Sequence, residues 1–279
     1  MLQVLHLSDL HFGDGQLSLG LLQREGGLFN KRLLGFANRK FNRKRRFAEE
    51  RKLALIEYCM DLDFDYLILS GDLTHLSTSA EFLEARAALE PLLSKVPGRV
   101  LLTAGNHDRY TRSATQEKLL ELHFGDCFPF IDTEHQGPHF LIDPQGWMFL
   151  ELPMSRPTGL HSKGKLAWNL QAYRDLLAAY PNHQKLLYGH YPLVYPGGQS
   201  EAFSHSLAGR KEVLQLLKQP GVRGYLHGHI HHSWAFQPFA ETDFWSVNAG
   251  GSVKEGGYLI SLSAEGLPWI SPSKLELPA

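Results

Sequence analysis

The 279-residue sequence contains little of what marks a secreted or membrane-spanning protein. Its two cysteines, Cys59 and Cys127, cannot build a framework of disulfides, so we expect a reducing compartment. No apolar run approaches the roughly 20 residues that cross a bilayer. The first residues, MLQVLHLSDLH, lack the basic and apolar regions of a secretory signal. These absences favour a cytoplasmic protein that lies at most peripherally on the inner face of a membrane.

Apolar residues make up 43% of the sequence and charged residues 20%, which is typical of a globular protein with a sizeable core. Short apolar runs alternate with stretches of helical periodicity, which favours a layered α/β fold in a single domain spanning 1–279. Strands are predicted at 3–7, 66–70, 99–103, 139–142, 148–152, 185–188, 224–227, 233–237, 244–248 and 258–263. Helices are predicted at 47–61, 79–93, 165–180 and 210–218. The proline-punctuated tail, 266–279, is expected to lie over the surface.

Histidine is abundant, with 15 residues, and side chains that bind metals or carry protons follow five of the predicted strands. They are Asp9 and His11 in SDLH, Asp72 in SGDLTH, Asn106, His107 and Asp108 in GNHD, His190 in GHYP, and His229 and His231 in HGHIH. Because the carboxyl ends of strands in α/β sheets meet at one edge, we expect these side chains to converge.

A set of this size exceeds the needs of one tetrahedral ion. Buried carboxylates without partners are costly, so the set predicts two divalent ions about 3.5–4 Å apart, with positions open to water and substrate. Carboxylate, imidazole and amide ligands without cysteine favour Mn²⁺, with Fe or Zn²⁺ as alternatives. The competing interpretations are a coincidental set of caps and core polar groups, or a fold that has lost its metals.

In order and complete, the five motifs resemble the signature of the calcineurin-like metallophosphoesterases: Asp-x-His, Gly-Asp, Gly-Asn-His-Asp or -Glu, Gly-His and Gly-His-x-His. The match runs from Asp9 to His231 and covers most of the chain. The resemblance implies a four-layer α/β/β/α sandwich with a dinuclear metal site at the sheet edge. It also implies hydrolysis of a phosphomonoester, phosphodiester or pyrophosphate by a water activated between the metals.

The resemblance also implies roles for individual residues. Asp9, His11 and His231 would hold one metal, Asn106, His190 and His229 the other, and Asp72 would bridge them. His107 would face the substrate, as a donor to a phosphoryl oxygen or an acid for the leaving group, with Asp108 orienting its ring and keeping it charged. His75, three residues after Asp72, is as good a candidate for the substrate pocket as for an ordinary loop residue.

A basic insertion at about 24–48 separates the first motif from the next predicted helix. Residues 31–46 carry eight basic side chains and no acid in a chain of formal net charge −1. Because these charges repel one another, we expect contact with an anionic membrane surface or an amphiphilic phosphorylated substrate. Nucleic acid is a less favoured partner, and a solvated face is the alternative. Lys31, Arg32, Arg45 and Arg46 are the candidate substrate contacts.

The insertion resembles one bacterial branch of the family, the UDP-2,3-diacylglucosamine pyrophosphatases of lipid A synthesis. The matching residues are Lys31, Arg32, Gly35, Asn38, Arg45 and Arg46. This resemblance implies a nucleotide-linked lipid precursor as the substrate. The alternative enzyme is a cyclic nucleotide phosphodiesterase, and the alternative outside enzymes is a non-catalytic binding scaffold on the same fold.

Overall fold

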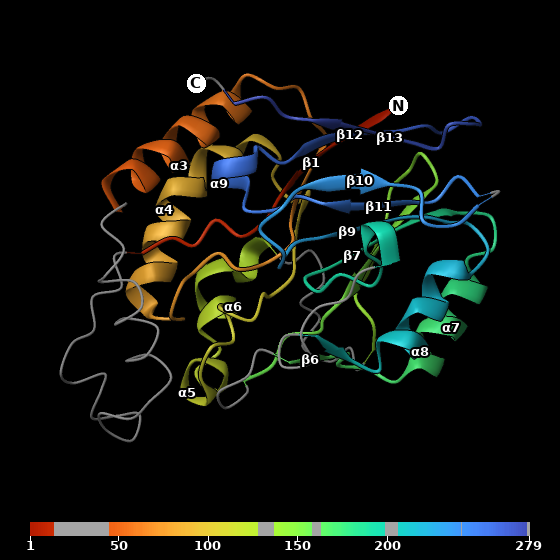
Figure 1. Ribbon diagram of the computed structural model, residues 1–279, viewed down its shortest axis with the longest axis horizontal. Helices are drawn as coiled ribbons and strands as arrows, with labels where there is room; N and C mark the ends of the chain where they lie inside the picture. Colours follow the sequence, from red (N-terminus) through yellow and green to blue (C-terminus); the bar gives the residue numbers. More distant parts are fainter. Residues whose placement is uncertain (14–44, 128–136, 158–162, 199–205, 241, 278–279) are drawn as a thin grey trace.

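The computed structural model describes residues 1–13, 45–127, 137–157, 163–198, 206–240 and 242–277 (Figure 1). Most of the basic insertion, including Lys31 and Arg32, lies outside these ranges. Arg45 and Arg46 begin helix α3, and only the backbone of that first turn is described.

Two sheets form the centre of the molecule. The first sheet has the order β13-β12-β1-β2-β3, in which β1, β2 and β3 are parallel and β12 and β13 are added antiparallel. Its strands are β1 (Leu2–Leu7), β2 (Tyr66–Leu69), β3 (Val100–Leu102), β12 (Tyr258–Leu262) and β13 (Ile270–Lys274). All but β13 were predicted.

The second sheet has the order β10-β11-β9-β7-β5-β4, with a parallel centre and an antiparallel strand at each edge. Its strands, all predicted, are β4 (Phe140–Ile142), β5 (Trp147–Leu152), β7 (Gln184–Gly189), β9 (Val222–His227), β10 (Trp234–Phe236) and β11 (Trp245–Asn248). A two-stranded ladder of β6 (Gly164–Lys165) and β8 (Leu207–Ala208) was not predicted.

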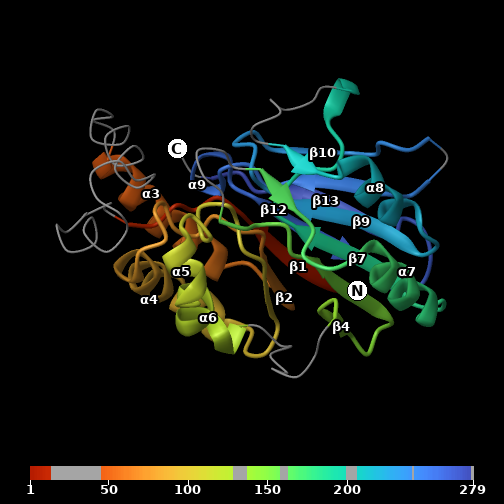
Figure 2. The ribbon, with the colours of Figure 1, turned by 90° about the horizontal axis from the view of Figure 1, so that it is seen from below.

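Helices cover the outer face of each sheet, and Figure 2 shows the two helical groups on opposite sides of the strands. On the first sheet lie α3 (Arg45–Met60), α4 (Ser79–Lys95) and α6 (Leu119–Phe124), with α5 (Arg112–Gln116) beside α6. On the second lie α7 (Leu170–Ala179) and α8 (Arg210–Leu214), which continues as a 3-10 turn over Gln215–Lys218. The short α9 (Ser252–Glu255) contacts α3.

Alternate residues of β1 show why the layers stack in this way. Leu5 and Leu7 pack into the core beneath α3, α4 and α6, whereas Leu2 and Val4 pack into a second core between the sheets. A third core joins the other sheet to α7 and α8. Since successive strand residues point to opposite faces, both faces of each sheet are buried. Three cores between four layers confirm the predicted α/β/β/α sandwich.

Differences from the prediction arise where local signals were weak. The tail does not simply lie over the surface, because Ile270–Lys274 forms edge strand β13. An edge strand tolerates Pro272, which has no N–H to donate to a neighbouring strand. Helix α7 begins at Leu170, not at 165, because Asn169 caps it by accepting from the Ala172 N–H. Among the described residues, no helix is long and apolar enough to span a membrane.

Candidate metal centre

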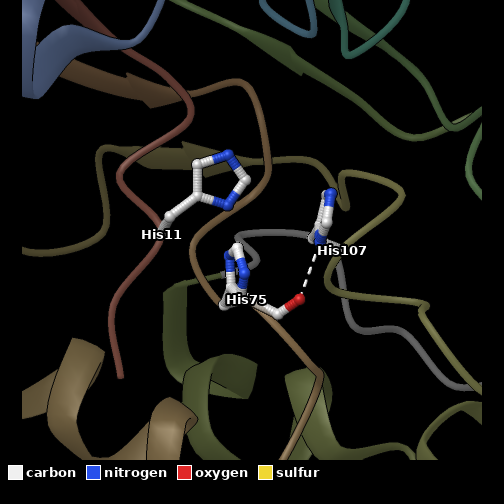
Figure 3. A group of neighbouring side chains, drawn as sticks. All are labelled: His11, His75 and His107. Atoms are coloured by element: carbon white, nitrogen blue, oxygen red, sulfur yellow. Dashed lines mark hydrogen bonds between the residues drawn. The ribbon is translucent and has the colours of Figure 1, made fainter. Parts of the chain in front are cut away.

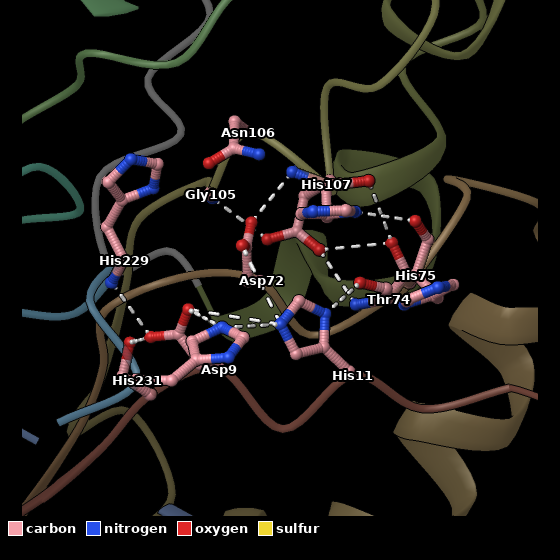
Figure 4. A network of polar contacts seen from close by, with 12 residues as sticks. Asp9, His11, Asp72, Thr74, His75, Gly105, Asn106, His107, His229 and His231 are labelled. Atoms are coloured by element: carbon pink, nitrogen blue, oxygen red, sulfur yellow. Dashed lines mark hydrogen bonds and ion pairs between the residues drawn. The ribbon is translucent and has the colours of Figure 1, made fainter. Parts of the chain in front are cut away.

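The strand ends converge as predicted, and they do so from both sheets. Asp9 and His11 follow β1, Asp72 follows β2, and Asn106 follows β3 of the first sheet. From the second sheet, His190 follows β7, and His229 and His231 follow β9. Figure 4 shows side chains from both sheets gathered at this edge, with Asp9 and Asp72 among the labelled residues.

One group consists of Asp9, His11 and His231, whose ligand atoms all lie within 4.8 Å of one another. Nε2 of His11 lies 3.2 Å from Nε2 of His231. The latter nitrogen lies 3.3 Å from Oδ1 of Asp9, a carboxylate that is buried. This is the set of side chains that the family resemblance implies for one metal.

The second group consists of Asp72, His190 and His229, and it meets the same distance limit. Nε2 of His190 lies 3.4 Å from Oδ2 of Asp72 and 3.2 Å from Nδ1 of His229. Oδ1 of Asn106 lies 3.1 Å from the same His190 nitrogen. Asp72 also lies next to the first group, since its Oδ2 is 3.9 Å from Nε2 of His11, which suits a bridging carboxylate.

Backbone atoms orient two of these imidazoles. Nδ1 of His11 donates to the Thr74 carbonyl oxygen at 3.1 Å, and Nδ1 of His190 donates to the Ser70 carbonyl oxygen at 2.8 Å. Because these carbonyls accept from Nδ1, it is Nε2 of each ring that faces the carboxylates. The arrangement directs at the site the nitrogen that would bind a metal ion once it carries no proton.

Burial and neighbouring charges shift the pKa values of the site in different directions. Burial lowers the pKa of His11 to about 4, despite the nearby Asp72 carboxylate. Burial also opposes the charged form of His190, but the carboxylates of Asp72 and Asp9 outweigh it and raise the His190 pKa to about 9. Burial likewise opposes ionisation of Asp72, yet facing imidazoles led by His190 hold the Asp72 pKa well below its usual range.

Two observations test whether divalent ions fit these groups. Oδ1 of Asp9 is buried and accepts no hydrogen bond within the described ranges, although Oδ2 accepts from Ser8 and from the His229 N–H. The imidazole nitrogens lie 3.2 Å apart in each group. Two nitrogens bound to one ion at about 2.1 Å lie roughly 3.4 Å apart in a tetrahedral arrangement. The two imidazoles of each group are therefore placed to bind one cation, so the two groups together fit two ions.

His107 lies beside the two groups, and its ring is held by a backbone atom. Its Nδ1 donates to the His75 carbonyl oxygen at 2.7 Å, while its main-chain N–H donates to Oδ1 of Asp72 at 2.7 Å. The ring stacks on those of His75 and Tyr110, with centroids 5.4 and 5.2 Å away. These contacts leave Nε2 of His107 as the nitrogen available to a substrate.

The prediction that Asp108 orients the His107 ring is wrong. The Asp108 carboxylate is buried and accepts from the Thr74 N–H at 3.0 Å and the Gly105 N–H at 2.9 Å. It thereby joins the loops after β2 and β3, a structural role that motif spacing alone could not distinguish from a catalytic one. Burial, reinforced by the charge of Asp72, raises the Asp108 pKa to about 6.

His75 lies next to the site, in a third group with His11 and His107 (Figure 3). This group is less suited to a metal than the other two. His11 already belongs to the first group, and the third group contains no carboxylate to balance an ion's charge. His75 thus lies beside the rings of His11 and His107, with centroids 5.5 and 5.4 Å away.

Several contacts at the site involve residues that the sequence did not single out. The Ser8 hydroxyl donates to Oδ2 of Asp9 at 2.6 Å, the Tyr110 ring stacks on His107, and Lys52 of α3 donates to the His11 carbonyl oxygen at 2.8 Å. Ser8 and Tyr110 lie within three residues of a predicted site residue. Lys52 carries no such signal, because it is 41 residues from His11.

Comparison with known proteins shows the family to which a chain with this fold and these paired groups belongs. Residues 2–233 match the calcineurin-like phosphoesterase family, so the chain belongs to that family. Its members are hydrolases of phosphate esters that normally bind two divalent ions, and this chain has the candidate ligand groups.

A relative from Rhodococcus erythropolis, named "Probable cyclic nucleotide phosphodiesterase", is 29% identical over 170 residues. The match covers 61% of this chain and 52% of the relative, so this chain spans about half of the relative's length.

Two solved structures share the architecture at low sequence identity. A dimetal phosphatase from Danio rerio is 12% identical with a TM-score of 0.56, over 94% of this chain and 92% of that one. A purple acid phosphatase from yellow lupin (Lupinus luteus) seeds is 15% identical with a TM-score of 0.53, over 96% of this chain and 47% of that one. At these identities the similarity shows the fold.

Proposed function

We propose that the chain is a dinuclear-metal phosphohydrolase that cleaves a phosphodiester or pyrophosphate bond. The observation that carries this proposal is the pair of side-chain groups, each with a buried carboxylate and two imidazoles, that share the edge of both sheets. Asp9, His11 and His231 would hold one ion, and Asn106, His190 and His229 the other. Asp72 would bridge them. We propose Mn²⁺, with Fe or Zn²⁺ as alternatives for the same ligand types.

Bound divalent ions would supply charge that polarises the phosphoryl group and lowers the pKa of a water nucleophile. The protein's own contribution is position and proton transfer. His107 would aim Nε2 at the substrate, because its Nδ1–H is committed to the His75 carbonyl. A protonated Nε2 donates to a phosphoryl oxygen or to the leaving group. His75 would line the same side of the substrate.

For the substrate, we propose a nucleotide-linked lipid precursor similar to UDP-2,3-diacylglucosamine. The support comes from the sequence: eight basic residues and no acid in 31–46 suit an anionic amphiphile and the surface of a membrane. Lys31, Arg32, Arg45 and Arg46 would contact the substrate or the membrane. A cyclic nucleotide phosphodiesterase is the second candidate, favoured by the name of the Rhodococcus erythropolis relative.

The test is hydrolysis with Mn²⁺ of cyclic AMP and of UDP-2,3-diacylglucosamine in detergent micelles, side by side. A matched pair of variants refines it. Replacing Lys31, Arg32, Arg45 and Arg46 by Gln should cripple lipid hydrolysis. The control replaces four exposed basic residues elsewhere, Arg51, Arg174, Lys211 and Lys254, and should leave it unchanged. Preference for cyclic AMP, insensitive to the first variant, would favour the second candidate.

A non-catalytic scaffold is distinguished by metal analysis. The proposed enzyme should take up about two equivalents of Mn²⁺, Fe or Zn²⁺ per chain, and a scaffold should not. Hydrolysis of neither substrate with both ions bound would retain the reaction class and exclude both substrates.

A further inference from the structure

A cavity of about 610 Å³ lies at the opposite edge of the second sheet from the metal centre, beside the 3-10 turn that continues α8. Its wall includes Pro220, Gly221 and Val222, which lead into β9. The candidate ligands His229 and His231 follow the other end of that strand. Six strand residues span roughly 20 Å, so this cavity is separate from the metal centre.

Positive charge gathers around this cavity. Lys218 and Arg223 line it, and Lys185 lies directly behind its wall, since Nζ of Lys185 is 2.8 Å from where a Cβ on Gly221 would be. Within the described ranges, no carboxylate comes within ion-pair distance of these three cations. The nearby Asp243 directs its oxygens to the Trp269 N–H and the Gln237 amide instead.

Of the three cations, Lys185 gives the strongest support for a bound anion, because its side chain is fully buried. Nζ donates to the Pro220 carbonyl oxygen at 3.1 Å, which satisfies one of three N–H groups. Burial, with repulsion from Arg223, lowers the Lys185 pKa. A buried ammonium without a counter-charge is costly, and an anion in the adjoining cavity would reduce that cost.

The rest of the lining combines apolar and aromatic side chains with the polar residues Gln219 and Thr242. Phe244 and Val222 are buried at its base, and Phe239 lies against it with the Lys218 ammonium 5.4 Å from the ring centroid. Inorganic phosphate would fill only a small part of such a space and would leave this surface wet. An anion that carries an apolar body would neutralise the charge and cover the apolar wall together.

We propose that this cavity binds an organic anion with an apolar or aromatic body, its charged group toward Lys185, Lys218 and Arg223 and its body against Phe239 and Phe244. The site is independent of the metal centre and of the hydrolysis proposed for it.

The test uses 8-anilinonaphthalene-1-sulfonate as a fluorescent probe of the intact protein, with decanoate, 1-decanol and inorganic phosphate as competitors. We expect saturable binding at one site, with decanoate displacing the probe at a concentration at least about tenfold below that of the neutral alcohol, a difference of about 1.4 kcal/mol. Phosphate should compete poorly. Equal displacement by decanoate and 1-decanol, strong competition by phosphate, or no saturable binding would overturn the proposal.

Variants locate the binding. The affinity for the probe should fall by about tenfold in Lys185→Met and by about threefold in Lys218→Met. The control is Lys211→Met, at an exposed position on α8, whose affinity for the probe should stay within about twofold of the parent. Phosphoesterase activity of Lys218→Met should equal that of the parent, because Lys218 lies at the opposite edge. Unchanged affinity in both Lys185→Met and Lys218→Met would show that the probe binds elsewhere.

Discussion

The Lys52 ammonium donates a 2.8 Å hydrogen bond to the main-chain oxygen of His11 and so joins helix α3 to the loop after β1. Lys52 is buried, pairs with Glu49 at 2.7 Å and lies 5.0 Å from the centroid of the Phe12 ring. The His11 backbone is left-handed, with φ of 48°. A donor to its carbonyl helps to hold that conformation, and α3 is the helix that follows the basic insertion.

Lys52→Met keeps the aliphatic stem and removes the donor. We expect the affinity of the Asp9, His11 and His231 group for its ion to fall by about tenfold, the lower end of what outer partners of metal ligands contribute. Metal titration with elemental analysis measures this. Lys52→Arg should restore part of the affinity, and the exposed Arg51→Met is the control. Parental affinity in Lys52→Met would show that α3 does not position His11.

His107→Gln should lower kcat by about 10² to 10⁴, the range for loss of a general acid, while both ions remain bound. Steady-state kinetics and metal content are read on the same sample. His232→Gln, an exposed neighbour of His231, serves as the control. If turnover of His107→Gln stays within about tenfold of the parent, His107 is not the acid.

Asp108→Ala tests the corrected role of Asp108. The change leaves the Thr74 and Gly105 N–H groups without their carboxylate, so the free energy of unfolding should fall by about 1–3 kcal/mol for each buried donor left unpaired. Denaturant unfolding measures it. In the plot of kcat against pH, any inflection that comes from His107 should stay at the same pH in Asp108→Ala. If that inflection moved while the stability stayed unchanged, Asp108 would act on His107 as the sequence predicted.

His190 makes metal uptake depend on pH. Its pKa of about 9, raised by Asp72 and Asp9 against the effect of burial, means that the ring is protonated at neutral pH before an ion binds. Uptake must release that proton, so affinity should rise with pH up to about 9. Calorimetry in buffers of different ionisation enthalpy counts the protons, and an apparent enthalpy independent of the buffer would contradict the prediction.

The same group affects the stability of the protein without metals. Because the folded pKa of His190 is above its ordinary value of 6.5, its contribution is fully present below about pH 6.5 and is lost as the pH rises through about 9. Thermal unfolding in excess chelator should show this loss, and His190→Gln should remove it. A profile that is the same in both proteins would refute the assignment.

Chelation should lower stability even at constant pH. Each candidate group takes side chains from both sheets, so an ion in either group would fasten one sheet to the other. Adding Mn²⁺ at about 100-fold above its Kd should add about 2.7 kcal/mol per site. Hydrogen exchange at β1 and β9 should slow together. Asp72→Asn should lose most of the gain, and an equal gain in that variant would point to binding elsewhere.

The sequence predicted much of the fold because its strands are short apolar runs that end in polar motifs. Val100–Leu102 illustrates this, as a buried strand directly followed by Asn106 and His107 at the site. Strand β13 was missed because Pro272 argues against a strand unless it lies at a sheet edge, and edge position depends on the whole topology. Helices α5 and α6 are too short to show a period.

At the site, the sequence predicted which side chains gather but not which backbone atoms hold them. The His107 ring is fixed by the carbonyl of His75, 32 residues away, and Asp108 is drawn to amides of two loops. Such contacts depend on loop conformation, which motif spacing does not encode. The contact between Lys52 and the His11 carbonyl was not predicted either, because nothing in the sequence of the helix indicates that this lysine reaches the site.

Four of the candidate ligand positions, Asp9, His11, Asp72 and His229, have left-handed backbones, with φ from 48° to 72°. For residues other than glycine this conformation costs about 1–2 kcal/mol each, so these candidate ligand positions lower the stability of the fold. Glycine or asparagine at His11 or His229 would relieve this strain and remove a candidate ligand. Such a variant should keep the same architecture in a sturdier protein with a weaker metal centre.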